Sequence, residues 1–518
     1  MKIIKIFKTF CIVLLALLIV VAIYAYSNMR DRHRGYSVDL TIPPGSPGVI
    51  KAGFAAVTIT PEYMEPWHDV NNNARYEPED GDTYDDLNSN NKFDTYWIAG
   101  FGNKVAAQGV HDEIWARTMV LDDGRSRIAV VALDIIGLFH PVVIDIRDML
   151  PASAGITYLT IASTHTHEGP DMMGLWGESP FKSGVNKEWK EYVKKRVVQS
   201  VMEAVNAIKP AHLRFSQNLT DGIVTLKDTR EPDVFDEGLR MLQAMDAETG
   251  KCLGTLIQWA NHPETLWSRN LLISSDFPHY LREAVEKGVH KDSITLAEGV
   301  GGIAVYVNGA IGGLMTTHPS VGVKDPLADT TYLAPSFDKA RAQGNIIGII
   351  ALQAMKENPV EVMEATISLR ARTFELPLQN SLFRLAAAIG VMDADMTWWM
   401  KKRSEAAVWS IGPASFLTFP GELYPEILNG GIVALPGRDF EINPVETPSL
   451  RSLMKGEFRF AIGLANDEVG YVIPKSQWDV EAPFVYNDKS SYGEENSLGP
   501  ETAPLLYKEL KLLIEELP

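Results

Sequence analysis

Two histidines separated by one residue are the strongest chemical feature of the sequence. They lie in segment 163–170 (STHTHEGP), directly after the run 156–162 (ITYLTIA), which predicts a buried strand. Because residues two apart in an extended chain point to the same side, His165 and His167 could approach one metal ion or one substrate together. Two neutral imidazoles suit zinc, which takes three or four nitrogen, oxygen or sulfur ligands. The alternative is a pair of polar loop histidines that hydrogen-bond to their neighbours.

Three other side chains could complete such a site, although each has a plain structural explanation by itself. His262 follows a strand-like run at 253–260 and is also consistent with a structural histidine. Glu422, in the segment FPGE, stands at an expected helix start, where the helix dipole favours a carboxylate. Tyr471, in the segment GYVI, is equally consistent with a core tyrosine.

Alternating strand-like and helix-like runs position these residues. Apolar and β-branched runs predict strands at 127–135, 156–162, 253–260 and 365–376. Apolar residues at helical spacing predict helices over 188–208, 277–287 and 336–355, with Asp276 as the N-cap of the second. This alternation predicts a mixed α/β (α+β) fold, with β-sheets flanked by helices in one large multilayer domain covering residues 51–518.

The N-terminus has the composition of a membrane segment. Residues 9–29 carry no charge, residues 10–26 are almost wholly apolar, and three lysines precede them. A helix of about 20 residues spans a bilayer core, whereas the apolar part of a secretory signal has about 7–15 residues. We therefore predict an uncleaved signal anchor, a transmembrane helix within residues 1–35. A linker at 36–50 would join it to an extracytoplasmic (periplasmic or extracellular) domain. A cleaved signal, which would give a secreted protein, is the alternative.

The overall composition excludes several classes of protein. A net charge of −18 opposes contact with phosphate backbones, so no nucleic-acid partner is expected. Hydrophobic residues make up 46% of the chain and charged residues 22%, which argues against a disordered protein. Cys11 and Cys252 are the two cysteines, and Cys11 lies in the apolar N-terminal run. This excludes a disulfide framework and a cysteine-based zinc ribbon.

An insertion at 69–94 that is rich in aspartate and asparagine has the residue types of a calcium site. Oxygen-bearing side chains recur at alternate positions of two short segments, as in calcium-binding loops. Neither segment has glycine at its sixth position or a final glutamate, so neither is a standard EF-hand, and a solvated acidic loop is the alternative. We predict structural calcium on Asp69, Asn71, Asn73 and Asp80, and on Asp86, Asn88, Asn90 and Asp94.

A second apolar stretch, at 382–400, ends in Trp398 and Trp399 and is followed by the basic residues 401–403 (KKR). Tryptophans beside basic residues suit a bilayer interface, so this pair is a candidate membrane contact and substrate entrance. A partly buried amphipathic helix is the alternative.

Taken in order, these segments resemble the neutral/alkaline non-lysosomal ceramidase family. The most specific part is 163–170, which is similar to the family's Thr-His-Thr-His-Ser-Gly-Pro box. The resemblance covers roughly residues 50–515. It rests on 53–61 (GFAAVTITP), 109–120 (GVHDEIWARTMV), 163–170, 261–263 (NHP), 274–276 (SSD), 419–422 (FPGE), 464–472 (LANDEVGYV) and 492–500.

The resemblance implies a zinc amidohydrolase. The zinc ligands of the family fall on four positions: His165, His262, Glu422 and Tyr471. His167 then lies beside the metal as a proton donor, and Arg117 is a weaker catalytic candidate. Such a ligand set leaves zinc open to water, whose pKa falls to about 7 on the metal, although manganese or iron is compatible as well. The implied reaction cleaves the N-acyl amide bond of ceramide or a related N-acyl lipid, which releases a fatty acid and a sphingoid-type amine.

Two departures from the family keep other functions open. Met315, in 308–317 (NGAIGGLMTT), stands where the family has a serine proposed to be catalytic, and the sequence is expected to lack the family's C-terminal immunoglobulin-like domain. A serine hydrolase of the nucleophile-elbow type is not expected, because no Gly-x-Ser-x-Gly motif occurs. One alternative is a zinc hydrolase of the same architecture that acts on another amide or ester. The other is a metal-stabilised protein that binds an amphiphile or glycan without turnover.

Overall fold

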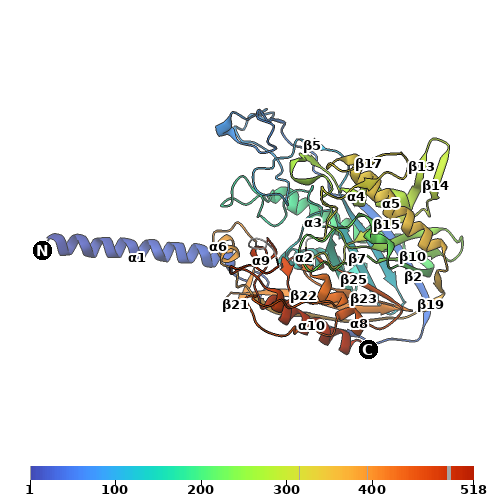
Figure 1. Cartoon of the computed structure of the whole chain (residues 1–518). Helices are drawn as coiled ribbons and strands as arrows, with labels where there is room; N and C mark the ends of the chain where they lie inside the picture. Colours follow the sequence, from blue (N-terminus) through green and yellow to red (C-terminus); the bar gives the residue numbers. More distant parts are fainter. Residues whose placement is uncertain (1, 314, 394, 399, 487–491) are drawn as a thin grey trace.

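In the computed structural model, two β-sheets pack face to face between layers of helices (Figure 1). The structure describes residues 2–313, 315–393, 395–398, 400–486 and 492–518. Helices cover the outer face of each sheet, so the order of layers is helix, sheet, sheet, helix. The predicted fold class, a mixed α/β domain of several layers, is confirmed.

The larger sheet has ten strands, of which eight follow the order β15-β11-β10-β9-β2-β6-β7-β8. The pairs β7/β8 and β11/β15 are parallel, and the other pairs on this path are antiparallel. The strands are β2 (Gly48–Thr58), β6 (Trp115–Asp122), β7 (Arg127–Leu133), β8 (Tyr158–Ser163), β9 (Lys209–Asn218), β10 (Leu239–Asp246), β11 (Cys252–Gln258), β15 (Ile303–Val307), β18 (Val360–Val362) and β19 (Glu364–Ala365).

The smaller sheet has the order β1-β20-β22-β23-β25, with β21 paired to β22. Its strands are β1 (Asp39–Ile42), β20 (Ile367–Pro377), β21 (Met396–Trp398), β22 (Lys401–Ile411), β23 (Ala414–Thr418) and β25 (Phe458–Ile462). The pair β23/β25 is parallel. Strand β1 lies inside the predicted linker 36–50 and pairs antiparallel with β20, so this part of the chain is built into the sheet. The division of the chain at residues 35 and 50 stays a prediction.

The strands bury alternate residues in two different cores, as the period of two in a β-strand requires. In β6, Met119 and Leu121 face the smaller sheet, where they share a core with Trp409 of β22. Val120 between them faces the helix layer. That layer consists of α2 (His140–Met149) and α3 (Lys187–Asn206) at one end of the sheet and α4 (Phe277–Lys287) and α5 (Phe337–Lys356) at the other. Helix α10 (Thr502–Glu516) covers the smaller sheet.

The predicted helices are confirmed to within two residues at each end by α3, α4 and α5. Asp276 caps α4, because its carboxylate accepts a hydrogen bond from the backbone N–H of Phe277. The apolar stretch 382–400 is divided between a short helix, α6 (Ser381–Ala388), and β21.

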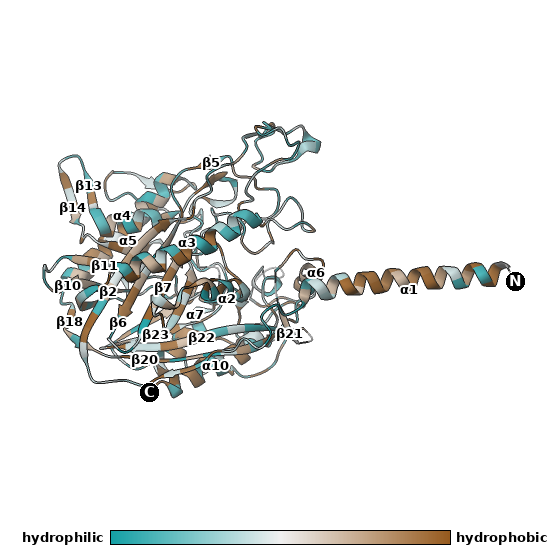
Figure 2. Cartoon of the chain, turned by 180° about the vertical axis from the view of Figure 1, so that it is seen from behind, coloured by the Kyte–Doolittle hydropathy of each residue, from teal (hydrophilic) through white to brown (hydrophobic). Residues whose placement is uncertain are grey.

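Helix α1 (Lys2–Met29) projects from the body, with apolar residues along most of its length (Figure 2). By length and composition it could cross a membrane, a property that signal sequences near an N-terminus share.

Candidate metal centre

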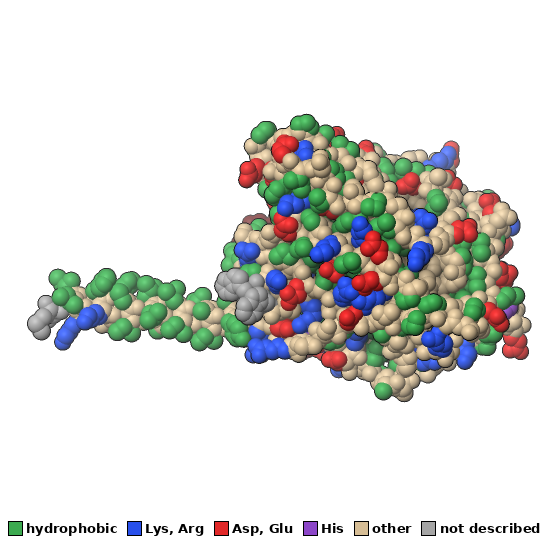
Figure 3. All heavy atoms as spheres, turned by 90° about the horizontal axis from the view of Figure 1, so that it is seen from below, with side chains coloured by type: hydrophobic (Ala, Val, Ile, Leu, Met, Phe, Trp, Pro, Cys, Tyr) green, Lys and Arg blue, Asp and Glu red, His purple; other side chains and the backbone are tan. Residues whose placement is uncertain are grey.

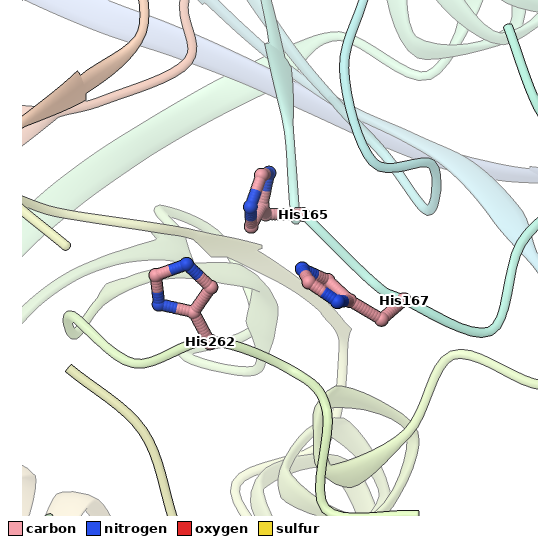
Figure 4. Close-up of side chains that lie close together, drawn as sticks. All are labelled: His165, His167 and His262. Carbon is pink, nitrogen blue, oxygen red and sulfur yellow. The ribbon is translucent and has the colours of Figure 1, made fainter. Parts of the chain in front are cut away.

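The candidate site lies where strands from both sheets end. His165 and His167 follow β8, and His262 follows β11. Each of the three offers a ring nitrogen, and these nitrogens lie within 4.8 Å of one another (Figure 4). The two histidines after β8 do meet, but not through the extended backbone expected from their spacing. His165 has φ +69°, so the chain turns there and brings the rings together across the turn.

Backbone carbonyls orient two of the imidazoles. Nδ1 of His165 lies 2.6 Å from the carbonyl oxygen of Ile136, and Nδ1 of His262 lies 2.8 Å from that of Met315. A carbonyl oxygen can only accept, so each Nδ1 carries a proton. Nε2 is then the atom of each ring that faces the centre and could bind a metal ion when unprotonated. This is the arrangement that metal-binding histidines need.

Glu422 and Tyr471 reach the same point from segments that follow β23 and β25 of the smaller sheet. They are partners in a short parallel strand pair formed by β24 (Glu422–Leu423) and β26 (Tyr471–Val472). Nε2 of His262 lies 3.0 Å from Oε2 of Glu422 and 3.5 Å from the hydroxyl of Tyr471. The other carboxylate oxygen of Glu422 lies 3.7 Å from Nε2 of His165. The four side chains predicted to bind one zinc ion are therefore close together.

The expected position of Glu422 at a helix start is wrong. The residue lies in β24, and the next helix, α7 (Pro425–Asn429), begins three residues later. Pairing with β26 fixes the backbone there, because Glu422 donates its N–H to the carbonyl of Gly470. The carboxylate is therefore held by strand pairing instead of by a helix dipole.

His167 lies beside this group and faces a carboxylate that the sequence analysis did not single out. Its Nδ1 is 3.4 Å from Oε2 of Glu264, and neither ring nitrogen makes a hydrogen bond within the described part of the chain. Gly100 packs directly on the ring, with φ +112°, and a Cβ there would lie 2.4 Å from Nδ1. The ring of Phe101 meets it edge-on at 5.1 Å. His167 is thus fixed by packing, with both nitrogens available.

Burial and mutual charge set the protonation of the site. Burial lowers the pKa of His165 and of His167 well below the usual range, and the neighbouring His262 adds to the effect. For His262 burial is the largest single effect and also lowers the pKa, but the hydrogen bond and charge of Glu422, with contributions from Glu264 and Met315, together raise it. Burial, together with the charge of Glu422, keeps the pKa of Tyr471 well above its usual range. His165 and His167 are therefore kept neutral, whereas the carboxylate of Glu422 favours the protonated form of His262.

Two further buried acids adjoin the centre. Burial raises the pKa of Glu264 to about 7. Burial, with the charge of Glu422, raises the pKa of Glu468 well above its usual range. The sequence analysis missed both. For Glu264 the signal was its position two residues after His262.

A pocket with mainly apolar walls leads to this centre. His165, His167, Glu422, Glu468 and Tyr471 lie at its polar part. The apolar lining consists of Ile136, Phe139, Met173, Leu175, Trp176, Phe383, Met392 and Leu498, with Tyr492 beside them. Apolar walls with a few converging polar groups are the usual composition of a small-molecule site.

Asn308 joins the loops that carry the histidines and was also missed. It follows β15 and is fully buried. Its amide donates to the carbonyls of Thr164, at 3.0 Å, and Asn261, at 2.9 Å, and its oxygen accepts from the N–H of Asn261 at 3.0 Å. One side chain thus ties the loop after β8 to the loop after β11.

Known proteins are similar to this chain in sequence and in fold. The sequence profile described as "Neutral/alkaline non-lysosomal ceramidase, N-terminal" matches residues 95–314. The matched range contains all three histidines, whereas Glu422 and Tyr471 lie beyond it. The resemblance to the neutral/alkaline ceramidase family is confirmed.

The fold is that of solved ceramidases. The neutral ceramidase from Pseudomonas aeruginosa matches with a TM-score of 0.61 at 16% identity, over 91% of this chain and 75% of that chain. A ceramidase complexed with C2 matches with a TM-score of 0.61 at 15% identity, over 91% of this chain and 76% of that chain. No curated protein sequence gave a significant match.

Met315 has a structural role beside the candidate site. Its side chain is fully buried in a small cluster with Ala260, Ile311 and Leu464. Its carbonyl accepts from both the backbone N–H and Nδ1 of His262. At this position the chain therefore has a backbone support for a candidate ligand.

Arg117 is not brought together with the histidines. Its guanidinium pairs with Glu286 of α4 and donates to the carbonyl of Ala304 at 3.0 Å. It lies between β6, β15 and α4, where it satisfies a buried carbonyl.

The predicted interfacial tryptophans are described in part. Trp399 lies outside the described residues. For Trp398 only the backbone is described, and it belongs to β21. The basic residues after them are used in ion pairs: Lys401 with Glu375, buried Lys402 with Asp467, and Arg403 with Asp31. A membrane contact at this pair stays a prediction.

The two acidic loops have the same backbone form. Asp69 accepts from the N–H groups of the residues four and five positions later, and Asp86 does the same. The fourth and sixth residues of both loops have positive φ, at Asn72, Ala74, Ser89 and Asn91. Asp94 accepts from the amides of Asn88 and Asn90. In the first loop the carboxylate of Asp82 accepts hydrogen bonds from the backbone N–H groups of Val70 and Glu77. Asp80 is the last residue of a short 3-10 turn. Calcium at these loops stays a prediction.

Proposed function

We propose that this chain is a metal-dependent amidohydrolase that cleaves the N-acyl bond of ceramide or a related N-acyl lipid. The observation that carries the proposal is the convergence of His165, His262, Glu422 and Tyr471 on one point at the polar part of an apolar pocket. The family match supports a lipid amide as the substrate class.

The residues present fit zinc. Two imidazoles that are anchored through Nδ1 and present Nε2 to the centre, one carboxylate and one phenol make a nitrogen and oxygen donor set of the size that zinc takes. When bound, zinc supplies a Lewis acid that polarises the amide carbonyl and makes water nucleophilic at neutral pH. Because Ile136 and Met315 hold the two rings from behind, the donor atoms are in place before any ion arrives.

His167 is suited to move the proton. Its pKa is held low by burial and by His262, so at neutral pH the ring can accept a proton at Nε2 from the attacking water. Glu264, 3.4 Å from Nδ1, would stabilise the imidazolium and keep the ring oriented. As the carbonyl carbon gains its new bond to oxygen and the C–N bond breaks, the same Nε2 proton passes to the leaving nitrogen. The products are a carboxylic acid and an amine.

The remaining residues hold the substrate. The phenol of Tyr471 keeps its proton, since burial and Glu422 raise its pKa, and it can donate to the oxygen that becomes negative as water adds. The apolar walls around Phe139, Met173 and Met392 exclude water from the acyl chain. We further propose that α1 is retained as a membrane anchor and that the catalytic domain lies outside the cytoplasm.

The test is hydrolysis of a fluorescent short-chain ceramide by the full chain in detergent micelles, before and after a zinc chelator and after zinc is added back. We expect turnover to be lost with the chelator and restored by zinc, and His165→Ala to be inactive under all three conditions. His290→Ala, in the hairpin of β13 (Gly288–Lys291) and β14 (Ile294–Glu298), is the matched control and should behave like the unaltered protein (Figure 1).

Two results would contradict the proposal. A folded chain that binds zinc but releases no fatty acid would exclude ceramide as substrate, and a panel of other N-acyl amides and esters would then be tried. A folded chain that takes up no metal would overturn the four-residue site itself.

A further inference from the structure

Helix α1 contacts the body at the end of α6. The hydroxyl of Tyr24 donates to the carbonyl of Ile389 at 3.1 Å, and the amide of Asn28 donates to the carbonyl of Ala388 at 2.9 Å. Ala388 is the last residue of α6 and Ile389 is its C-cap, where the carbonyls of a helix have no intrahelical partners. The contact therefore joins the foot of α1 to α6 (Figure 1).

Ion pairs immediately after α1 hold the same junction. Arg32 donates through Nε to Asp395 at 2.7 Å and also pairs with Asp393. Asp31 pairs with Arg403 of β22 at 2.7 Å. Lys190 of α3 shares Asp393 at 2.7 Å. Charged side chains from three distant segments thus fix the direction in which α1 leaves the body.

Some apolar side chains of α6 face solvent, and another lines the pocket. Leu382 is 65% exposed and Leu385 is 50% exposed, and residues three apart lie on the same face of a helix. Phe383 between them is half-buried and lines the pocket that leads to the metal centre. The helix is therefore both the wall of the pocket and an outward apolar surface.

The apolar length of α1 indicates that a bilayer would cover the exposed apolar side of α6. Figure 3 shows α1 projecting from the body with hydrophobic side chains around its length. A helix of 28 residues is about 42 Å long, which is more than the roughly 30 Å core of a bilayer. With α1 in a bilayer, its foot at Tyr24 and Asn28 lies at the membrane surface, and α6, bonded to that foot, lies there too.

We propose that α6 rests on the surface of the bilayer that holds α1, so that the pocket opens toward the membrane and receives its lipid directly from it. Leu382 and Leu385 enter the headgroup region, and Phe383 marks the path from there to the metal centre. The delivery step rests on the proposed amide hydrolysis, whereas the contact between α6 and the bilayer does not.

The contact is tested by the depth of spin labels in the full chain, reconstituted in phosphatidylcholine vesicles. Single cysteines replace Leu382 or Leu385 in a background with Cys11→Ser and Cys252→Ser. Ile294, which is 58% exposed on β14, is the matched position away from α6. We expect labels at 382 and 385 to be shielded from a water-soluble nickel relaxation agent and accessible to oxygen, and the label at 294 to be open to nickel. Equal nickel accessibility at all three positions would overturn the contact.

The delivery step is tested by the double variant Leu382→Asn/Leu385→Asn, with Ile294→Asn/Leu296→Asn as the control. We expect turnover of a long-chain ceramide embedded in the same vesicles to fall about tenfold in the first variant, since two leucines lose their apolar contact. Turnover of a water-soluble short-chain substrate should stay within about twofold, and the control should change neither rate.

The two proposals fail in different ways. If the unaltered protein hydrolyses neither substrate, the proposed function fails and the label depths still decide the contact. If both substrates slow equally in the α6 variant while the labels lie in water, membrane delivery is wrong and the hydrolysis stands.

Discussion

Glu422 and Tyr471 are direct partners in a parallel strand pair, although the whole of β25 lies between them in the sequence. The pairing places a carboxylate and a phenol side by side, and both lie close to Nε2 of His262, which follows β11 of the larger sheet. The candidate centre is thus assembled at the seam between the two sheets, and its parts can be tested one at a time.

Removing the charge of Glu422 should remove the metal. We expect Glu422→Gln to lower zinc affinity by at least about 100-fold, because even outer-shell partners of metal ligands cost about 10–100-fold. Hydrolysis should fall in parallel. Metal content of the purified protein and turnover at fixed free zinc measure the two effects. Glu375→Gln, on a surface ion pair with Lys401, is the control. Full metal content in Glu422→Gln would remove this residue from the ligand set.

Glu264 should act through His167 and not through the metal. We expect Glu264→Gln to keep its zinc and to lose about 10- to 100-fold in kcat, because the imidazolium of His167 loses the carboxylate 3.4 Å away. The variant should also shift the pH profile of kcat, which a merely structural change would leave in place. An unchanged profile together with an unchanged kcat would mean that His167 needs no partner.

Met315 should matter for stability and not for chemistry. Replacing this fully buried side chain by serine should destabilise the protein by about 2–5 kcal/mol, since a cavity and a hydroxyl would replace a packed thioether. No gain of activity is expected, because Met315 supports His262 through its backbone carbonyl. Thermal unfolding and turnover measure both. Met363→Ser, at a methionine that is 53% exposed, is the control. Faster hydrolysis in Met315→Ser would restore the serine to the mechanism.

Glu426 should make the protein less stable as the pH rises. Burial raises the pKa of this carboxyl from its ordinary 4.5 to about 7. A carboxyl whose pKa is higher in the folded than in the unfolded state contributes its stability below about pH 4.5 and loses it as the pH rises through 7. Glu426→Gln should therefore be more stable than the unaltered protein at pH 8, by on the order of 2 kcal/mol, and similar near pH 4.

Melting temperatures across this pH range check the sign of the Glu426 effect. Glu361→Gln, at a largely exposed ion pair with Arg214, should follow the unaltered protein at every pH. A Glu426→Gln variant whose melting temperature changes with pH as steeply as that of the unaltered protein would contradict the assignment.

Calcium should stabilise the chain if the two acidic loops bind it. After chelation, added calcium should raise the melting temperature, by the equivalent of about 2.7 kcal/mol at 100 times the dissociation constant. Asp69→Ala combined with Asp86→Ala should abolish the shift, because each carboxylate orders its own loop. Asp148→Ala, at an exposed position on α2, is the control. A shift that survives in the double variant would place the calcium elsewhere.

The sequence by itself determined the local parts of this protein. Amphipathic spacing and an N-cap were enough for α4, and a continuous apolar run was enough for β8, because these elements depend on neighbours along the chain. The His-x-His segment after β8 and the family resemblance were likewise visible in contiguous residues. The resemblance is confirmed by the family match, whereas metal binding by the histidines stays a proposal.

The tertiary structure alone decided which acids lie beside the candidate centre. Glu264 and Glu468 lie beside the candidate histidines and the pocket, which no local pattern indicated. Glu422 lies in a strand and not at the expected helix start, because parallel pairing joins it to Tyr471. It also placed α6 between the pocket and the foot of α1. Such relationships arise from hydrogen bonds and burial between distant segments. The spacing of apolar residues along a helix or strand is a local property, so it does not predict them.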